Sequence, residues 1–270
     1  MINEILLGAG VGIALGLTGS GGVLAVPALM LGLGFTLQEA APVSLIAIGM
    51  GSLIGTIDGL RRGLVRYRAA LVMAGFGTLA APLGIHLSHI LPITLLTILF
   101  SLLLLMIAVK MVRQARKNQL ATEDDHKLAQ NCMLRPDTGR FQWNPKCFST
   151  LAGIGALSGL SSGLLGVGGG FLIVPGVQHF SNLGMHGIVA TSLAVITLIS
   201  GGTVVHSLMA GAEITAQGWW FIGATSVGLL AGRVAAPKLP ARVLQLSFAV
   251  LAAVVSVMMM YKYLLPVLLG

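Results

Sequence analysis

Two glycine-rich runs decide the fold: GSGGVLAVP at Gly19–Pro27 and GVGGGFLIVP at Gly166–Pro175. Each run interrupts an apolar segment, which is Ile5–Leu33 in the first case and Leu151–Phe180 in the second. Glycine in a helix interior costs about 1 kcal/mol relative to alanine, so both runs predict a broken helix. Inside a membrane, the backbone groups freed by a break are tolerated only within the protein or beside a water-filled cavity. The two runs therefore mark places where the chain turns inside the molecule.

The two runs belong to an internal duplication of the chain. When the sequence is shifted by 148 residues, Pro27 coincides with Pro175, and the matches extend from the N-terminus to about residue 113. The alignment needs one gap, which falls inside the glycine-rich run. Other coincident pairs are Ser44 with Ser192, Ser52 with Ser200, Gly63 with Gly211, Gly75 with Gly223, Gly84 with Gly232 and Pro92 with Pro240. We predict a first repeat at 1–113, a charged linker at 114–147 and a second repeat at 148–270.

The composition is that of an integral membrane protein. Of the 270 residues, 56% are hydrophobic and 9% are charged, whereas a soluble domain carries about 25% charged residues. Each repeat contains three further apolar stretches close to the roughly 20 residues that a helix needs to cross the hydrocarbon layer. They lie near residues 40–60, 68–88 and 92–113, and near 188–209, 216–235 and 241–262. We therefore predict an all-α protein embedded in the lipid bilayer.

The net charge of +8 does not indicate a nucleic-acid partner, because the basic residues form short clusters between apolar stretches. This distribution is typical of cytoplasmic loops in membrane proteins. The only cysteines, Cys132 and Cys147, lie in the linker. A cytoplasmic linker is not expected to hold a stable disulfide, and two cysteines are too few for a metal site. We expect no metal and no cofactor.

The basic residues also distinguish two topologies. If the first apolar segment of each repeat crosses the membrane, the repeats are parallel; if it turns back at its glycines, the second repeat is inverted. Inversion places Arg233, Lys238 and Arg242 on the same side as the arginines of 61–68 and leaves Lys262 on the other side. The positive-inside rule favours inversion and a cytoplasmic linker. The predicted fold is two inverted repeats in the inner membrane, each a re-entrant helical hairpin plus three transmembrane helices.

The glycine-rich runs are the candidate binding site. Consecutive glycine amides form an anion-binding concavity, and a helix that starts behind them adds a partial positive charge. Matching breaks in two repeats are also a sequence signature of a transporter's binding site. The candidate residues are Gly19, Ser20, Gly21, Gly22, Gly166, Gly168, Gly169 and Gly170, together with the hydroxyls of Ser44, Thr191 and Ser192. The alternatives are close helix packing for the glycines and hydrogen bonds to helical carbonyls for the hydroxyls.

A second group of residues is a candidate for gating or ion coupling. Asp58 lies three and four residues before Arg61 and Arg62, a spacing that favours a local ion pair. His206 occupies the position of Asp58 in the second repeat, and histidine titrates near neutral pH. Proton or sodium coupling and a homodimer remain open hypotheses. There is no GxSxG, no HExxH and no phosphate loop ending in GK[ST], so we expect no catalytic residues and no enzyme.

The same strings resemble the TauE/SafE sulfite-exporter family. They are GLTGSGGVLAVPALML at 16–31, GLLGVGGGFLIVPG at 163–176, PVSLIAIG at 42–49, ATSLAVIT at 190–197 and HSLMAGAEI at 206–214. The resemblance covers nearly the whole chain except the linker. It implies a secondary carrier of the inner membrane that exports sulfite or a small organosulfonate. The rival hypotheses are an importer of another small organic or inorganic anion and a membrane assembly or regulatory protein that transports nothing.

Overall fold

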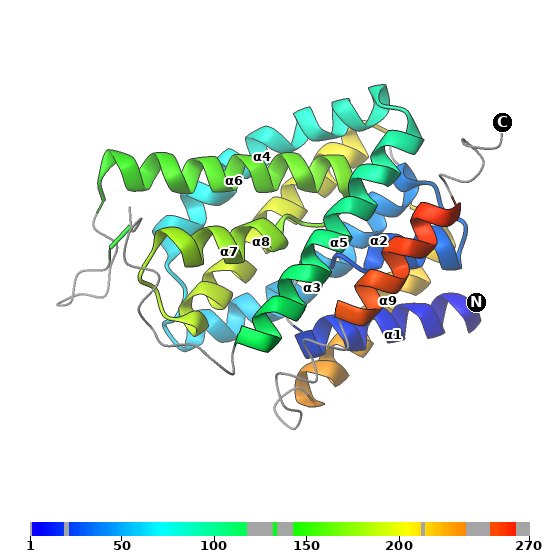
Figure 1. The fold of residues 1–270 in the computed structure, drawn as a ribbon, viewed down its shortest axis with the longest axis horizontal. Coiled ribbons are helices and arrows are strands. Elements are labelled where there is room, and N and C mark those ends of the chain that lie inside the picture. Colours follow the sequence, from blue (N-terminus) through cyan, green and yellow to red (C-terminus); the bar gives the residue numbers. More distant parts are fainter. Residues whose placement is uncertain are drawn as a thin grey trace.

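The computed structural model describes residues 2–18, 22–117, 132–133, 143–211, 214–235 and 249–262. These residues form a helical molecule (Figure 1). Its helices are α1 (Ile2–Thr18), α2 (Ala25–Gly32), α3 (Leu37–Arg61), α4 (Tyr67–Ile90), α5 (Ile93–Lys117), α6 (Pro145–Leu165), α7 (Gly170–Phe180), α8 (Met185–Met209) and α9 (Ala216–Ala235), followed by a C-terminal helix at Ala249–Lys262.

A helix occupies each of the six apolar stretches that we expected to cross the membrane. Among the described helices, α3, α4, α6 and α8 are long and apolar enough to span a bilayer. Large apolar side chains also lie on the outer surface, as in Leu79 of α4, which is 75% exposed, and Val227 of α9, which is 69% exposed. A surface of this kind fits contact with lipid rather than water. The prediction of an all-α membrane protein is confirmed.

The glycine-rich runs separate the two arms of a helical hairpin in each repeat. Gly32 of α2 packs against Leu7 of α1, and Gly176 of α7 packs against Ile154 of α6, so each second arm folds back along the first. The second arms contain 8 and 11 residues. At 1.5 Å per residue they are about 12 and 16 Å long, roughly half of the hydrocarbon thickness. The second arm of each hairpin is therefore too short to cross the bilayer by itself.

The first arm of the second hairpin is longer than the sequence predicted. We expected the apolar segment to begin at Leu151, but α6 begins at Pro145 and contains 21 residues. Proline is favourable in the first helical turn because its missing N–H has no partner there in any case. The added turn makes α6 long enough to cross the membrane.

The closest helix pairs each combine one helix from the first repeat with one from the second. The most extensive helix contacts in the described part of the chain join α1 to α9 and α4 to α6 (Figure 1). Within each pair the helices are parallel and their backbones are close: a Cβ on Gly12 would overlap the carbonyl of Thr225, and one on Gly159 would overlap that of Gly77. Small residues permit such an approach between membrane helices. Gly12 and Thr225 coincide with Gly159 and Gly77 in the duplication, so both pairs use the same seam.

The remaining long pair, α3 and α8, joins two helices that correspond in the duplication. Gly49 packs against Ser200 and Gly59 packs against Ala190. Between them, the hydroxyls of Thr56 and Thr197 are 3.2 Å apart. Residue numbers fall along α8 as they rise along α3, so the two helices are antiparallel. Matching helices of the two repeats therefore run in opposite directions at the centre of the molecule.

Candidate functional site

The second glycine-rich run is a tight turn between α6 and α7. Gly166, Gly168 and Gly169 have φ values of +69°, +71° and +68°. Glycine adopts this left-handed region without the steric penalty that a Cβ brings. The amide of Gly166 donates to the carbonyl of Ser162 and closes α6. The carbonyl of Gly169 accepts from Ile173, and α7 starts at Gly170.

Ser44 of the first repeat ties α3 to this turn. Its Oγ lies 2.6 Å from the carbonyl oxygen of Gly166 and 2.8 Å from that of Ala41. The side chain is fully buried. The candidate hydroxyl of Ser44 therefore reaches the glycine-rich run of the other repeat, where it satisfies a carbonyl that the break leaves without a helical partner.

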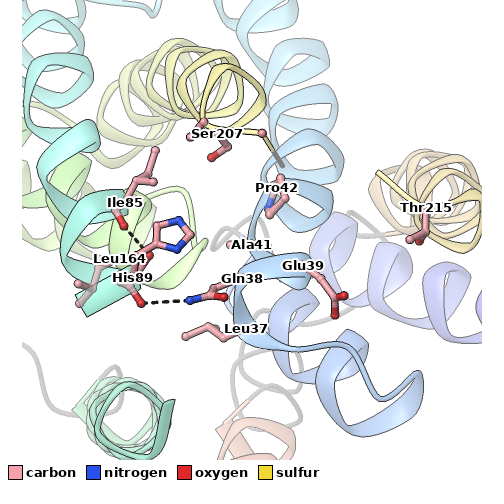
Figure 2. Close-up of a pocket in the computed structure, with 14 residues that line it drawn as sticks. Leu37, Gln38, Glu39, Ala41, Pro42, Ile85, His89, Leu164, Ser207 and Thr215 are labelled. Carbon is pink, nitrogen blue, oxygen red and sulfur yellow. Dashed lines mark hydrogen bonds between the residues drawn. The ribbon is translucent and has the colours of Figure 1, made fainter. Parts of the chain in front are cut away.

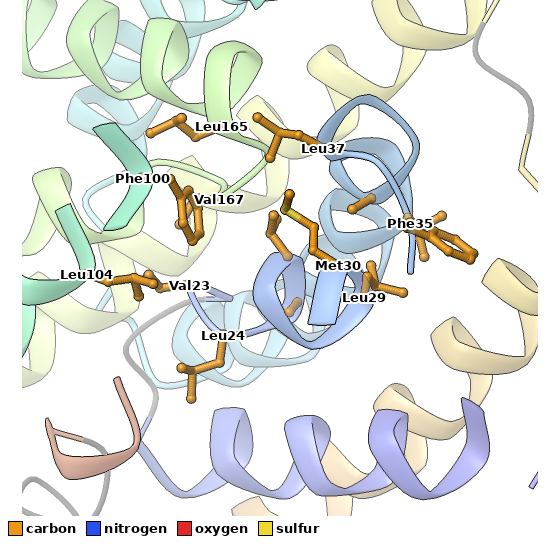
Figure 3. Packing of buried hydrophobic residues seen from close by; sticks show 14 of the residues in the cluster. Val23, Leu24, Leu29, Met30, Phe35, Leu37, Phe100, Leu104, Leu165 and Val167 are labelled. Atoms are coloured by element: carbon orange, nitrogen blue, oxygen red, sulfur yellow. The ribbon is translucent and has the colours of Figure 1, made fainter. Parts of the chain in front are cut away.

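The two glycine-rich runs approach one another at the centre of α3. Gly19, Ser20 and Gly21 lie outside the described residues, but Gly22 packs directly against Ile48. A Cβ on Gly168 would lie 3.3 Å from the same side chain. Figure 3 shows residues that flank both runs in one buried cluster: Val23 and Leu24 after the first run, Leu165 before the second run and Val167 within it. The apolar residues around both breaks thus share one core.

A cavity of about 420 Å³ reaches the end of α6, just before the second run. Its walls come from the start of α3, the end of α4 and the end of α8 (Figure 2). It reaches Gly163 and Leu164 in the last turn of α6. The ends of α3 and α4 that line it lie opposite the end of the molecule where the linker joins α6. The second glycine run is therefore approached from the side opposite the linker.

The walls of the cavity combine apolar and polar side chains. Ser88, His89 and Ser207 line it, and the side-chain amide of Gln38 donates to the carbonyl of Ser88 at 3.4 Å. The imidazole of His89 points from α4 toward α3 (Figure 2). The carboxylate of Glu39, also on the wall, accepts hydrogen bonds of 2.9 Å from the amide and the hydroxyl of Thr36. Its charge is thus held in the N-terminal cap of α3.

Thr191 and Ser192 are placed away from the second run. The hydroxyl of Thr191 accepts from the backbone amide of Arg66 at 3.1 Å, and that of Ser192 donates to the carbonyl of Ile188 at 2.7 Å. The part of α8 that contacts Gly168 begins at least a turn later. Ser192 makes the helical back-bond that was the alternative interpretation of its role.

The gating candidates lie at opposite ends of the molecule. Arg62 Nε donates to Asp58 Oδ1 at 3.0 Å, and this ion pair and Arg61 are exposed at the end of α3. His206 is exposed in the last turn of α8, which is antiparallel to α3. Its neighbour Ser207 lines the cavity. The predicted pairing of Asp58 with Arg62 is confirmed, but the structure does not bring His206 to that pair.

Two hydroxyls beside the second run were not among the predicted residues. Ser158 of α6 and Ser200 of α8 are fully buried, and neither hydroxyl has a hydrogen-bond partner in the described part of the chain. The sequence held one signal for them, since Ser200 coincides with Ser52 in the duplication. Serine is too common at membrane helix interfaces for this signal to stand out.

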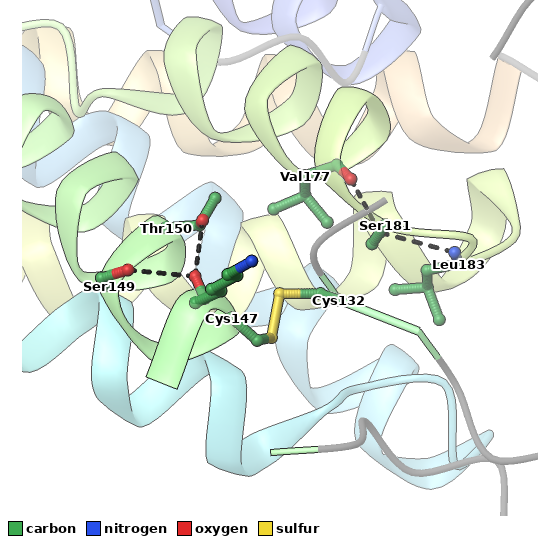
Figure 4. Close-up of a disulfide and its surroundings, with 8 residues drawn as sticks. Cys132, Cys147, Ser149, Thr150, Val177, Ser181 and Leu183 are labelled. Atoms are coloured by element: carbon green, nitrogen blue, oxygen red, sulfur yellow. Dashed lines mark hydrogen bonds between the residues drawn. A yellow bond between two sulfur atoms is a disulfide. The ribbon is translucent and has the colours of Figure 1, made fainter. Parts of the chain in front are cut away.

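The linker corrects another expectation. We expected no stable disulfide, but Cys132 and Cys147 are bonded to each other with their Cα atoms 4.9 Å apart (Figure 4). Both are fully buried. The expectation rested on the compartment of the linker, whereas the fold places Cys132 beside the end of α7 and Cys147 in the first turn of α6. The amide of Cys132 donates to the carbonyl of Phe180 at 3.0 Å. The linker therefore joins both open ends of the second hairpin.

The comparisons with known proteins agree with this architecture. The family model described as "Sulfite exporter TauE/SafE" matches residues 5–259. The chain belongs to the sulfite exporter TauE/SafE family. Two relatives from Xylella fastidiosa, strains Temecula1 and 9a5c, are each named "Probable membrane transporter protein". Each is 30% identical over 196 residues, which cover 71% of this chain and 69% of the relative. No solved structure matches the chain. This member of the TauE/SafE family is thus a multi-pass membrane protein of a transporter family.

The left-handed glycines of the turn give a test of its role. Gly168→Ala places a Cβ at φ +71° and 3.2 Å from Ser200 Oγ, and we expect transport to fall about tenfold or more, the effect of one lost charge-assisted hydrogen bond. Gly34→Ala is the matched control, because Gly34 has φ +73° and nothing within 4 Å of the added Cβ. Both variants carry the same backbone penalty of about 1–2 kcal/mol, visible in thermal unfolding. Equal flux in the two variants would remove Gly168 from the transport path.

The disulfide closes a loop with a sequence separation of 15, for which the loss of loop entropy in the unfolded chain predicts about 3 kcal/mol of stabilisation. We expect a reductant to lower the unfolding temperature of the purified, oxidised protein by several degrees. The Cys132→Ser/Cys147→Ser variant should unfold at the lower temperature with or without reductant. An unfolding temperature of the wild-type protein that is the same with and without reductant would contradict a stabilising role of the disulfide.

Proposed function

We propose that this chain is a secondary transporter that exports a small sulfur oxyanion, sulfite or an organosulfonate, across the inner membrane. The observation that carries the proposal is the convergence of both glycine-rich runs on Ile48, beside a cavity that reaches Gly163 near the end of α6. A small ligand that reached this point would meet backbone amides at the start of α7. Family membership supports solute movement rather than chemical conversion, so no residue is given a catalytic role.

The mechanism that we propose is alternating access between inverted repeats, at 1–113 and 148–270. The antiparallel contact of α3 with α8 supports inversion, because corresponding helices would then cross the membrane in opposite directions. Rocking about the α3–α8 face, with the α1–α9 and α4–α6 pairs moving as units, would expose the glycine turns first to one side and then to the other. In the present conformation the cavity opens on the side away from the linker. With a cytoplasmic linker, this is the outward-open state.

Inversion gives a topology prediction. A reporter that is active only outside the cytoplasm should be active when fused near Ala212, between α8 and α9, and inactive when fused in the linker at 114–147. The basic residues at 61–68 predict the same cytoplasmic result for a fusion between α3 and α4, which is the internal control. A cytoplasmic result at Ala212 contradicts inversion.

Flux in proteoliposomes tests the function itself. We expect labelled sulfite or a labelled small sulfonate to cross membranes that contain the protein, and the rate to respond to an imposed proton or sodium gradient if either ion is coupled. Empty liposomes measure the leak. If a carboxylate or another inorganic anion crosses the membrane and no sulfur oxyanion does, the protein transports that other class of anion. A folded protein that moves and binds none of these anions would point to an assembly or regulatory role.

A further inference from the structure

Ser158 and Ser200 hold hydroxyls that the fold leaves without a partner. An unsatisfied buried hydroxyl costs about as much as a lost hydrogen bond, and a serine on a helix can avoid this by donating to the carbonyl of the preceding turn. Ser192 does so at 2.7 Å. In the described part of the chain, Ser158 and Ser200 do not, although both are fully buried. Within the described residues, neither proton has an acceptor.

Both hydroxyls flank the N-terminus of α7. Ser200 Oγ would lie 3.2 Å from a Cβ on Gly168, and the Cβ of Ser158 would lie 2.8 Å from one on Gly169. Helix α7 contains 11 residues and starts at Gly170. Leu172 and Ile173 donate to the carbonyl of Gly169, so the amides of Gly170 and Phe171 are the ones that a helix start leaves without a helical acceptor. The helix dipole places partial positive charge at this end. Both serines thus pack against the glycines that directly precede α7.

A line of hydroxyls connects the glycine turn to the cavity. Ser207 of α8 lines the cavity, Thr203 lies one turn further in, and Ser200 lies at the glycine turn. On α6, Ser162 lies one turn from Ser158, and its hydroxyl is 3.5 Å from that of Thr203. All but Ser207 are fully buried. Thr203 donates its own proton to the carbonyl of Ile199 at 2.7 Å, so along this line the described hydroxyls without an acceptor are those of Ser158 and Ser200 at the turn.

The charges around the turn limit what can bind there. The described lysine and arginine side chains of α3, α4 and α6 lie near helix ends, at Arg61, Arg68 and Lys146. None of the described residues of α7 and α8 is a lysine or an arginine. Burial of an ion without an opposite charge is costly, and the solvation that it loses grows with the square of its charge. Hydroxyls and a helix dipole can therefore compensate one negative charge far better than two.

We propose that Ser158, Ser200 and the first-turn amides of α7 form a binding subsite for a singly charged oxyanion of the sulfonate type. This inference rests on the proposed transport function and specifies the class of ligand that is bound. It is not duplicated, because the first repeat has Val11 where the second has Ser158. One anion is therefore bound at the second glycine turn, and doubly charged anions such as sulfate are excluded.

Binding to the purified full-length protein in detergent tests the subsite, with methanesulfonate and sulfate as the probes. We expect the wild type to prefer methanesulfonate, and Ser158→Ala and Ser200→Ala each to weaken its binding about tenfold. Without ligand, both variants should unfold at or above the wild-type temperature, because each loses an unsatisfied buried hydroxyl. Thr225→Val is the matched control: its hydroxyl is also buried and unpartnered, but it lies in the seam between α1 and α9. It should bind as the wild type does.

The outcomes separate the subsite from the transport function. Wild-type affinity in both serine variants would overturn the subsite while the wild type still bound an oxyanion. Tighter binding of sulfate than of methanesulfonate would overturn the limit to one charge. An equal loss in Thr225→Val would assign the effect to general packing and also overturn the subsite. A wild type that binds neither probe and transports no sulfur oxyanion would overturn the proposed function and the subsite together.

Discussion

This fold depends on finding partners for the backbone groups that a broken helix leaves free, and the hydrogen bond from Ser44 to the carbonyl of Gly166 provides one. A helix that breaks inside a membrane frees backbone groups that lipid cannot satisfy. Here α6 ends in mid-protein, and a hydroxyl from the other repeat lies 2.6 Å from the freed carbonyl. The break is stable only because α3 of the first repeat is present. The second repeat alone would contain a broken helix with an unsatisfied carbonyl at Gly166, so it depends on α3 of the first repeat to fold.

The seams between helices have a consequence for movement. Because α1 packs on α9 and α6 packs on α4 with backbone contact at glycine, the tightest pairs combine helices from different repeats. A rigid body in this protein is therefore an α1–α9 or an α4–α6 pair, not a sequence repeat. The looser elements are α3 and α8, whose shared face carries hydroxyls such as Thr56 and Thr197. Rocking would repack that face and leave the glycine seams intact.

The sequence predicted the helices well because their signal is local. Length and apolarity are enough to locate α3, α4 and α8, and the glycine runs locate both breaks. The hydroxyls of the site were harder to predict, because Ser192 and Ser158 have the same chemistry and differ only in their surroundings. Ser192 bonds to its own helix, whereas Ser158 has no described partner. That difference depends on how α6, α7 and α8 pack against one another, and a local sequence pattern does not predict this packing. The cysteine pair escaped prediction for a similar reason, since its proximity depends on where the linker meets α7.

The duplication supplies symmetric scaffolding for an asymmetric site. Both repeats contribute a glycine run, a hairpin and a glycine seam, and these features concern backbone geometry, which two opposed copies need equally. The hydroxyl chemistry differs: Val11 stands where the second repeat has Ser158, and Leu15 where it has Ser162. If both turns bound an anion, two like charges would lie within the shared core around Ile48 with little solvent to screen them. Val11 and Leu15, which replace those hydroxyls in the first repeat, avoid that repulsion. The symmetric backbone then provides access from two sides, while the asymmetric side chains hold a single anion.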